Sequence, residues 1–151
     1  MIVADASLLI QLAVVGEQTA LAEAVFERDP IWIVPMLWRS EVLNGLVKYF
    51  HLGLMEFESI MVSWHMAEEA VGGREYAVDA RKVLELATHT KCSSYDCEYV
   101  ALAQDLGVSL VTTDRRIIKA FPKTAVPLEK FGEEKNEPEV EHHRDAGRAE
   151  R

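Results

Sequence analysis

Apolar and polar positions along the chain fall into blocks that predict short buried strands separated by amphipathic helices. Apolar runs bounded by turn residues indicate the strands, which are expected at residues 1–5, 31–34, 108–111 and 124–128. Apolar residues that recur every three or four positions indicate the helices, which are expected at residues 7–15, 17–28, 36–50, 55–71, 76–88, 93–106 and 115–121. This alternation predicts an α/β fold with a mostly parallel central sheet flanked by helices on both faces.

The last twenty residues differ in composition from the rest. Their sequence, GEEKNEPEVEHHRDAGRAER, contains almost nothing apolar and carries seven acidic and four basic residues. Such a segment cannot bury enough apolar surface to offset the entropy of ordering it. We therefore expect one folded domain at residues 1–131 and a disordered charged tail at residues 132–151.

Overall composition narrows the class of protein. Hydrophobic residues make up 49% of the chain and charged residues 27%, the balance of a soluble globular protein. No apolar run is long enough to span a bilayer, and the first residues lack the basic segment of a secretory signal, so we expect a cytoplasmic location. The net charge of −9 argues against nucleic-acid binding through overall charge, unless the negative charge is concentrated around metal ions.

Four acidic residues lie near the ends of predicted strands or the starts of predicted helices: Asp5, Glu41, Asp96 and Asp114. In parallel sheets, ligands bind beyond the carboxyl ends of the strands, where such side chains can meet. Each acid also has an ordinary structural explanation. Aspartate caps helix N-termini, Ser93 and Asp96 have the spacing of a capping box, and Glu41 could lie on a polar helix surface.

The segments around these acids resemble the PIN-domain nucleases, above all the VapC-type toxins of prokaryotic toxin–antitoxin pairs. The similarity lies in VADAS at the N-terminus, in SEVLN on a helix, and in YDCEYVALAQDLGVSLVTTD. The resemblance covers residues 1–128 and implies that the four acids form a catalytic and metal-binding set. It also implies that nearby hydroxyls support this set, namely those of Ser7, Thr112 and Thr113. Some relatives carry another acid after the last aspartate, whereas Arg115 and Arg116 follow here.

Converging carboxylates repel one another unless a cation offsets their charge. A set with only oxygen ligands favours Mg²⁺ or Mn²⁺, and such an ion activates water and neutralises a phosphate. We therefore expect a metal-dependent endoribonuclease that hydrolyses RNA phosphodiester bonds. Arg115, Arg116 and Lys119 are candidates for holding the RNA backbone, or else ordinary solvated surface. The resemblance further implies the toxin of a type II toxin–antitoxin pair, a homodimer that binds a cognate antitoxin.

Other interpretations fit less well. A catalytically inactive PIN-like module that binds RNA or a protein partner is the main alternative, and the four intact acids argue against it. A haloacid-dehalogenase-type phosphatase needs a second aspartate where this chain has Ser7. Large apolar residues are abundant at residues 36–71, and some are expected to line a groove for an amphipathic antitoxin helix. Most of these large residues are expected in the core, and Trp38 and Trp64 are the two whose substitution tests the groove. The full set is Met36, Trp38, Met55, Phe57, Met61, Trp64 and Met66.

Overall fold

The computed structural model describes residues 1–133, which form a five-stranded parallel sheet covered by helices. The strands are β1 (Ile2–Ala4), β2 (Trp32–Pro35), β3 (Glu75–Tyr76), β4 (Leu110–Thr112) and β5 (Ala125–Pro127). Their order in space is β3-β2-β1-β4-β5, and every neighbouring pair is parallel. The predicted α/β fold is confirmed. Because β1 is central, its carboxyl end lies between those of β2 and β4.

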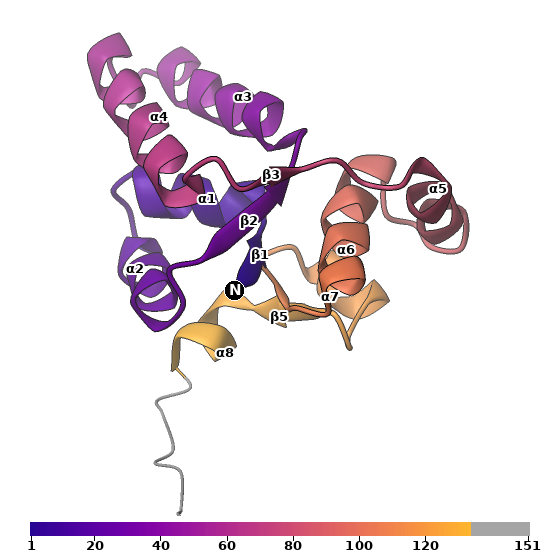
Figure 1. Cartoon of the computed structure of the whole chain (residues 1–151). Helices are drawn as coiled ribbons and strands as arrows, with labels where there is room; N and C mark the ends of the chain where they lie inside the picture. The colour runs from indigo at the N-terminus through magenta and orange to yellow at the C-terminus, as the bar shows by residue number, and fades with distance from the viewer. Residues whose placement is uncertain (134–151) are drawn as a thin grey trace, which may run out of the picture.

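Helices cover both faces of this sheet, as its parallel strands require. They are α1 (Ala6–Ala13), α2 (Thr19–Arg28), α3 (Trp38–His51), α4 (Phe57–Val71), α5 (Ala80–Thr88), α6 (Ser94–Leu106), α7 (Arg115–Ala120) and α8 (Leu128–Glu133). The group α1–α4 lies on one side of the strands, and α5–α7 lie on the other (Figure 1). In the described part of the chain, none of these helices combines the length and the apolar character needed to cross a membrane.

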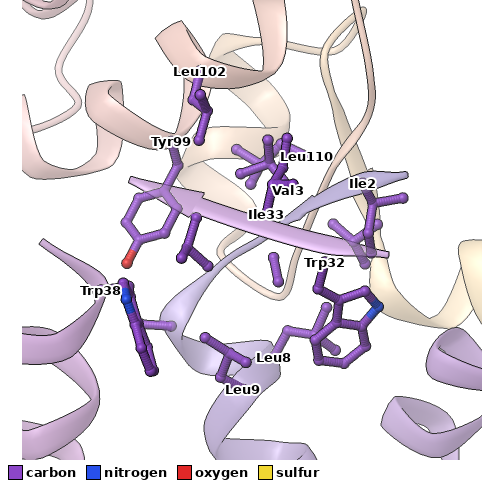
Figure 2. Close-up of a cluster of buried hydrophobic side chains, with 14 of the residues drawn as sticks. Ile2, Val3, Leu8, Leu9, Trp32, Ile33, Trp38, Tyr99, Leu102 and Leu110 are labelled. Carbon is purple, nitrogen blue, oxygen red and sulfur yellow. The ribbon is translucent and has the colours of Figure 1, made fainter. Parts of the chain in front are cut away.

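The hydrophobic core surrounds the three central strands. Val3 pairs with both Ile33 and Leu110 in register, and all three side chains are fully buried. Figure 2 shows Leu8 and neighbouring side chains of α1 on one side of these strands and Leu102 of α6 on the other. Burial of each such side chain contributes about 1.5–3 kcal/mol to folding. The core therefore fixes the ends of β1 and β4, which Asp5 and Asp114 follow.

Helices α1, α3 and α4 pack closely, which determines where α3 presents its first turn. A Cβ atom at Gly45 of α3 would lie 2.3 Å from Ile10 Cδ1 of α1, so only glycine permits this approach without a shift. Trp38 and Trp64 stack between α3 and α4 with ring centroids 5.3 Å apart. Trp38 is fully buried and Trp64 is 8% exposed. The two tryptophans are therefore core residues, and the prediction that they line an open groove is wrong.

Two elements differ from the predicted ones. The helix predicted at residues 76–88 begins only at Ala80, after Asp79 caps it, and Glu75–Tyr76 instead form β3 on the edge of the sheet. A two-residue strand is too short to give a recognisable pattern. The helix α8, Leu128–Glu133, follows β5 and was not predicted. The segment predicted as a disordered tail lies, from residue 134 onward, outside the described residues.

Candidate active site

Asp5 directly follows the central strand and occupies the N-cap position of α1, yet its side chain forms no capping hydrogen bond. Its carboxylate instead accepts hydrogen bonds from Ser7 Oγ at 3.2 Å and from Thr112 Oγ1 at 2.5 Å. Asp5 is only 9% exposed, and this burial raises its pKa, while the two hydroxyls oppose the rise. Burying a carboxylate is costly unless it is well paired. Helix capping therefore does not explain why an aspartate stands here.

A short chain of hydroxyls connects the ends of β1 and β4. Thr112 is fully buried, and its Oγ1 also accepts the backbone N–H of Asp114 at 3.0 Å. Thr113 Oγ1 donates to Ser7 Oγ at 3.2 Å, and Ser7 in turn donates to Asp5. All three hydroxyls implied by the resemblance thus lie together beside Asp5, where they fix its orientation.

Glu41 lies in the first turn of α3, the helix that follows β2, and its side chain is half-buried at the same end of the strands as Asp5. Burial raises its pKa, the Tyr99 hydroxyl opposes that rise, and the negative charges of Asp5 and Asp96 add to it. Glu41 Oε1 and Tyr99 Oη are both buried, and within the described residues neither completes a hydrogen bond of ordinary geometry. Glu41, Asp5 and Asp96 therefore share one electrostatic environment.

Asp96 and Asp114 both have structural partners at the starts of their helices. Ser93 Oγ accepts the Asp96 N–H at 3.1 Å, and the Ser93 N–H donates to Asp96 Oδ2 at 3.3 Å, which completes a capping box. Asp114 caps α7 by accepting the Arg116 N–H at 2.8 Å, and the Arg116 guanidinium lies 3.2 Å away. Burial alone would raise the Asp114 pKa, but the contacts with Arg116 outweigh it and lower the pKa. The capping explanation therefore holds for these two acids, although not for Asp5.

A divalent cation fits this set in chemistry, and the placement of the side chains shows what binding would require. Within residues 1–133, no three histidine, cysteine or acidic side chains gather closely enough to hold a metal ion as they stand. The four acids nevertheless offer only oxygen atoms, which hard cations prefer, and the buried Glu41 Oε1 completes no hydrogen bond of ordinary geometry within residues 1–133. Asp96 and Asp114 would have to rotate away from Ser93 and Arg116 to join Asp5 and Glu41.

Two polar residues near the set were not singled out from the sequence. Tyr99 faces Glu41, and its position three residues after Asp96 on α6 places both on one helix face. That spacing was a usable signal. Lys91 lies in the segment before α6, close to α7, and nothing in its local sequence marks it. Arg115, Arg116 and Lys119 are exposed on α7 beside Asp114, where the sequence predicted them.

Comparison with known proteins places the chain in a family. The PIN domain model matches residues 2–123, which covers most of the described chain. The chain is 30% identical over 132 residues to Ribonuclease VapC3 of Pyrobaculum aerophilum, an alignment that covers 83% of this chain and 98% of that protein. Its fold is similar to the crystal structure of PAE2754 from Pyrobaculum aerophilum, with a TM-score of 0.71 at 23% identity, over 87% of this chain and 85% of that one. The matched region contains the carboxyl ends of the central strands and all four acids. The chain belongs to the PIN-domain family, with a VapC-type ribonuclease among its relatives.

Proposed function

We propose that the protein is a metal-dependent endoribonuclease that hydrolyses phosphodiester bonds of RNA. The observation that supports this most is Asp5, a buried carboxylate at the end of the central strand that two hydroxyls hold and that forms no side-chain capping hydrogen bond to α1. A carboxylate kept in this way suits a cation ligand better than a structural role. The name of the relative, Ribonuclease VapC3, supports RNA as the substrate.

In this mechanism Asp5, Glu41, Asp96 and Asp114 would hold Mg²⁺ or Mn²⁺. A bound ion of this kind supplies activated water and offsets the negative charge of the phosphate. Ser7 and Thr112 keep the Asp5 carboxylate in one orientation. Burial and neighbouring charge raise the Glu41 pKa, which suits its carboxylate to orient the attacking water and accept its proton. Rotation of the Asp114 side chain away from Arg116 would free the Arg116 guanidinium to approach a phosphate.

The proposal extends to the toxin of a toxin–antitoxin pair, a homodimer whose partner is the cognate antitoxin. The similarity to a VapC protein supports it. Apolar side chains on and near α3 and α4 also support a protein partner, because several remain largely exposed: Met36, Leu43, Val47, Phe50, Phe57, Val62 and Met66. Co-purification of this chain with the product of a neighbouring small gene, and loss of RNA cleavage in that complex, would test this part.

Asp5→Asn tests the activity, because asparagine caps helices about as well as aspartate but removes the charge. We expect RNA cleavage to fall at least about 100-fold, equivalent to about 3 kcal/mol of barrier. Mg²⁺ at about 100 times its Kd should stabilise the wild type by about 2.7 kcal/mol. That corresponds to a rise in Tm of roughly 5–10 °C, which Asp5→Asn should lose.

Asp79→Asn is the matched control, because Asp79 is a true N-cap whose carboxylate accepts the N–H groups of Arg81 and Lys82. It should keep both the activity and the response to Mg²⁺. A folded Asp5→Asn variant with full activity would contradict the proposed function.

A binding module without nuclease activity is the second candidate. The observation in its favour is that Asp96 and Asp114 already serve as helix-capping residues. Under this alternative, the wild type would bind RNA but would not cleave it with either Mg²⁺ or Mn²⁺. The same cleavage and melting experiments therefore separate the two candidates.

A further inference from the structure

A hollow beside the acidic set is lined by basic residues and contains no acid. It lies between residues 89–92, which lead into α6, and the helix α7, and has a volume of about 570 Å³. Its polar lining consists of His89, Thr90, Lys91, Arg116 and Lys119. Positive charge gathered in this way is notable in a chain of net charge −9. We propose that this hollow, called here the α7 hollow, binds an RNA phosphate next to the one that is cut. This inference rests on the proposed function.

The α7 hollow adjoins the acidic set through Arg116. Arg116 lines the hollow, and its Nη2 lies 3.2 Å from Asp114 Oδ2. On another wall, Cys92 is buried, and after this burial the charges of Asp96 and Asp114 are among the causes that raise the pKa of its thiol. A strand whose scissile phosphate lies at the acids would therefore pass directly by the hollow.

Arg116 of the hollow is paired with Asp114, but in the described part of the chain the two lysines of the hollow have no such structural partner. Lys91 and Lys119 are exposed, and within residues 1–133 neither forms an ion pair with a carboxylate. The basic residues of α5 behave differently, because Arg81 pairs with Glu85 at 2.9 Å and Lys82 pairs with Asp105. The two lysines of the hollow are therefore available to an anion without loss of a structural contact.

The other polar groups of the hollow shape it. Thr90 Oγ1 donates to Leu86 O at 3.0 Å and accepts the Cys92 N–H at 3.3 Å. His89 Nδ1 lies 2.6 Å from Glu85 O, to which it donates. These bonds hold the segment that presents Lys91 opposite α7.

The chemistry of the hollow suits a phosphodiester. Lysine supplies a compact positive charge, and arginine can donate two parallel hydrogen bonds to phosphate oxygens. Contacts of this kind position a nucleic acid strand and carry no information about its sequence. The α7 hollow should therefore strengthen RNA binding equally for all sequences and help set which bond lies at the acids.

Lys91→Ala and Lys119→Ala, singly and together, test this. Binding of a fluorescent single-stranded RNA is measured by anisotropy at several salt concentrations, in an Asp5→Asn background that prevents cleavage. Each substitution should weaken binding several-fold, alike for different RNA sequences. Each should also reduce the slope of log affinity against log salt by about 0.7, the value for one phosphate contact to a single strand. All lysine variants should melt like the Asp5→Asn parent, because both lysine side chains are exposed.

Lys123→Ala is the control, because Lys123 is an exposed lysine that precedes β5. It therefore lies at the amino end of a strand, whereas Asp5 and Asp114 follow the carboxyl ends of β1 and β4. The α7 hollow is refuted if Lys91→Ala and Lys119→Ala match Lys123→Ala in affinity and salt slope.

Inorganic phosphate is the second probe. If it displaces RNA from the Asp5→Asn protein as strongly as unlabelled RNA does, the hollow is a site for free phosphate and the proposal fails. If these lysines matter for binding but the wild type cleaves no RNA, the hollow stands and the nuclease proposal falls.

Discussion

The Thr112 hydroxyl connects two of the four acids, and its removal gives a quantitative test of the site. Thr112→Val keeps the size of a fully buried side chain and replaces only the hydroxyl. The substitution removes the donor to Asp5 Oδ2 at 2.5 Å and the acceptor of the Asp114 N–H at 3.0 Å. Packing around β4 should change little, so the measured effect reports on these two hydrogen bonds.

Their loss should cost a large part of the stability. A hydrogen bond to a charged group contributes about 1.5–3 kcal/mol, and a neutral one about 1 kcal/mol. The free energy of unfolding at pH 7.5 should therefore fall by about 2.5–4 kcal/mol, and Tm by roughly 10 °C. RNA cleavage should also fall, because the Asp5 carboxylate would be free to reorient.

The loss of unfolding free energy caused by Thr112→Val should depend on pH, because the hydroxyl contacts the titratable carboxyl of Asp5. Burial raises the Asp5 pKa above its ordinary value, and the Thr112 hydroxyl opposes the rise. A raised pKa in the folded state means that stability is lost as the pH rises from about 4 through that pKa. Because Thr112→Val raises the Asp5 pKa further, the variant loses more stability than the wild type as the pH rises through this range. The deficit should therefore be largest at neutral pH and smaller near pH 4.

Urea unfolding in the presence of EDTA, at pH 7.5 and at pH 4, measures this deficit without metal. Thr124→Val is the matched control, because Thr124 Oγ1 accepts only a surface hydrogen bond from Gln104 at 3.3 Å. We expect the control to lose less than about 1 kcal/mol at both pH values. A Thr112→Val deficit that equals the control, or one that does not change with pH, would refute the reasoning.

Three further substitutions test the site and the core. Tyr99→Phe should change the free energy of unfolding by less than about 1 kcal/mol, because among the described residues the buried Tyr99 Oη makes no hydrogen bond of ordinary geometry. RNA cleavage should nevertheless fall, because Glu41 loses the hydroxyl that faces it, and unchanged cleavage would contradict that role. Trp64→Ala should cost about 3–5 kcal/mol in urea unfolding, because the ring is buried against Trp38. Phe57→Ala, at a side chain that is 62% exposed, should cost less than about 1 kcal/mol.

The sequence by itself determined the class of fold and the location of the acids along the chain. Short apolar runs alternating with helical patterns specify a parallel sheet, because only strands buried on both faces are apolar throughout. The capping interactions of Asp96 and Asp114 were equally readable, since a cap joins residues two or three positions apart. Local spacing was sufficient for these features because the contacts themselves are local.

Only the tertiary structure decided how Asp5 is used. Its partner Thr112 lies 107 residues away, and the two meet because β1 and β4 are neighbours in the sheet. The pattern of apolar residues does not state which strands are adjacent, so it could not distinguish a helix cap from a carboxylate held at the sheet edge. The approach of Tyr99 to Glu41 and that of Lys91 to α7 have the same origin. Each depends on how separate helices pack on the sheet, and packing is a property of the whole chain rather than of any local segment.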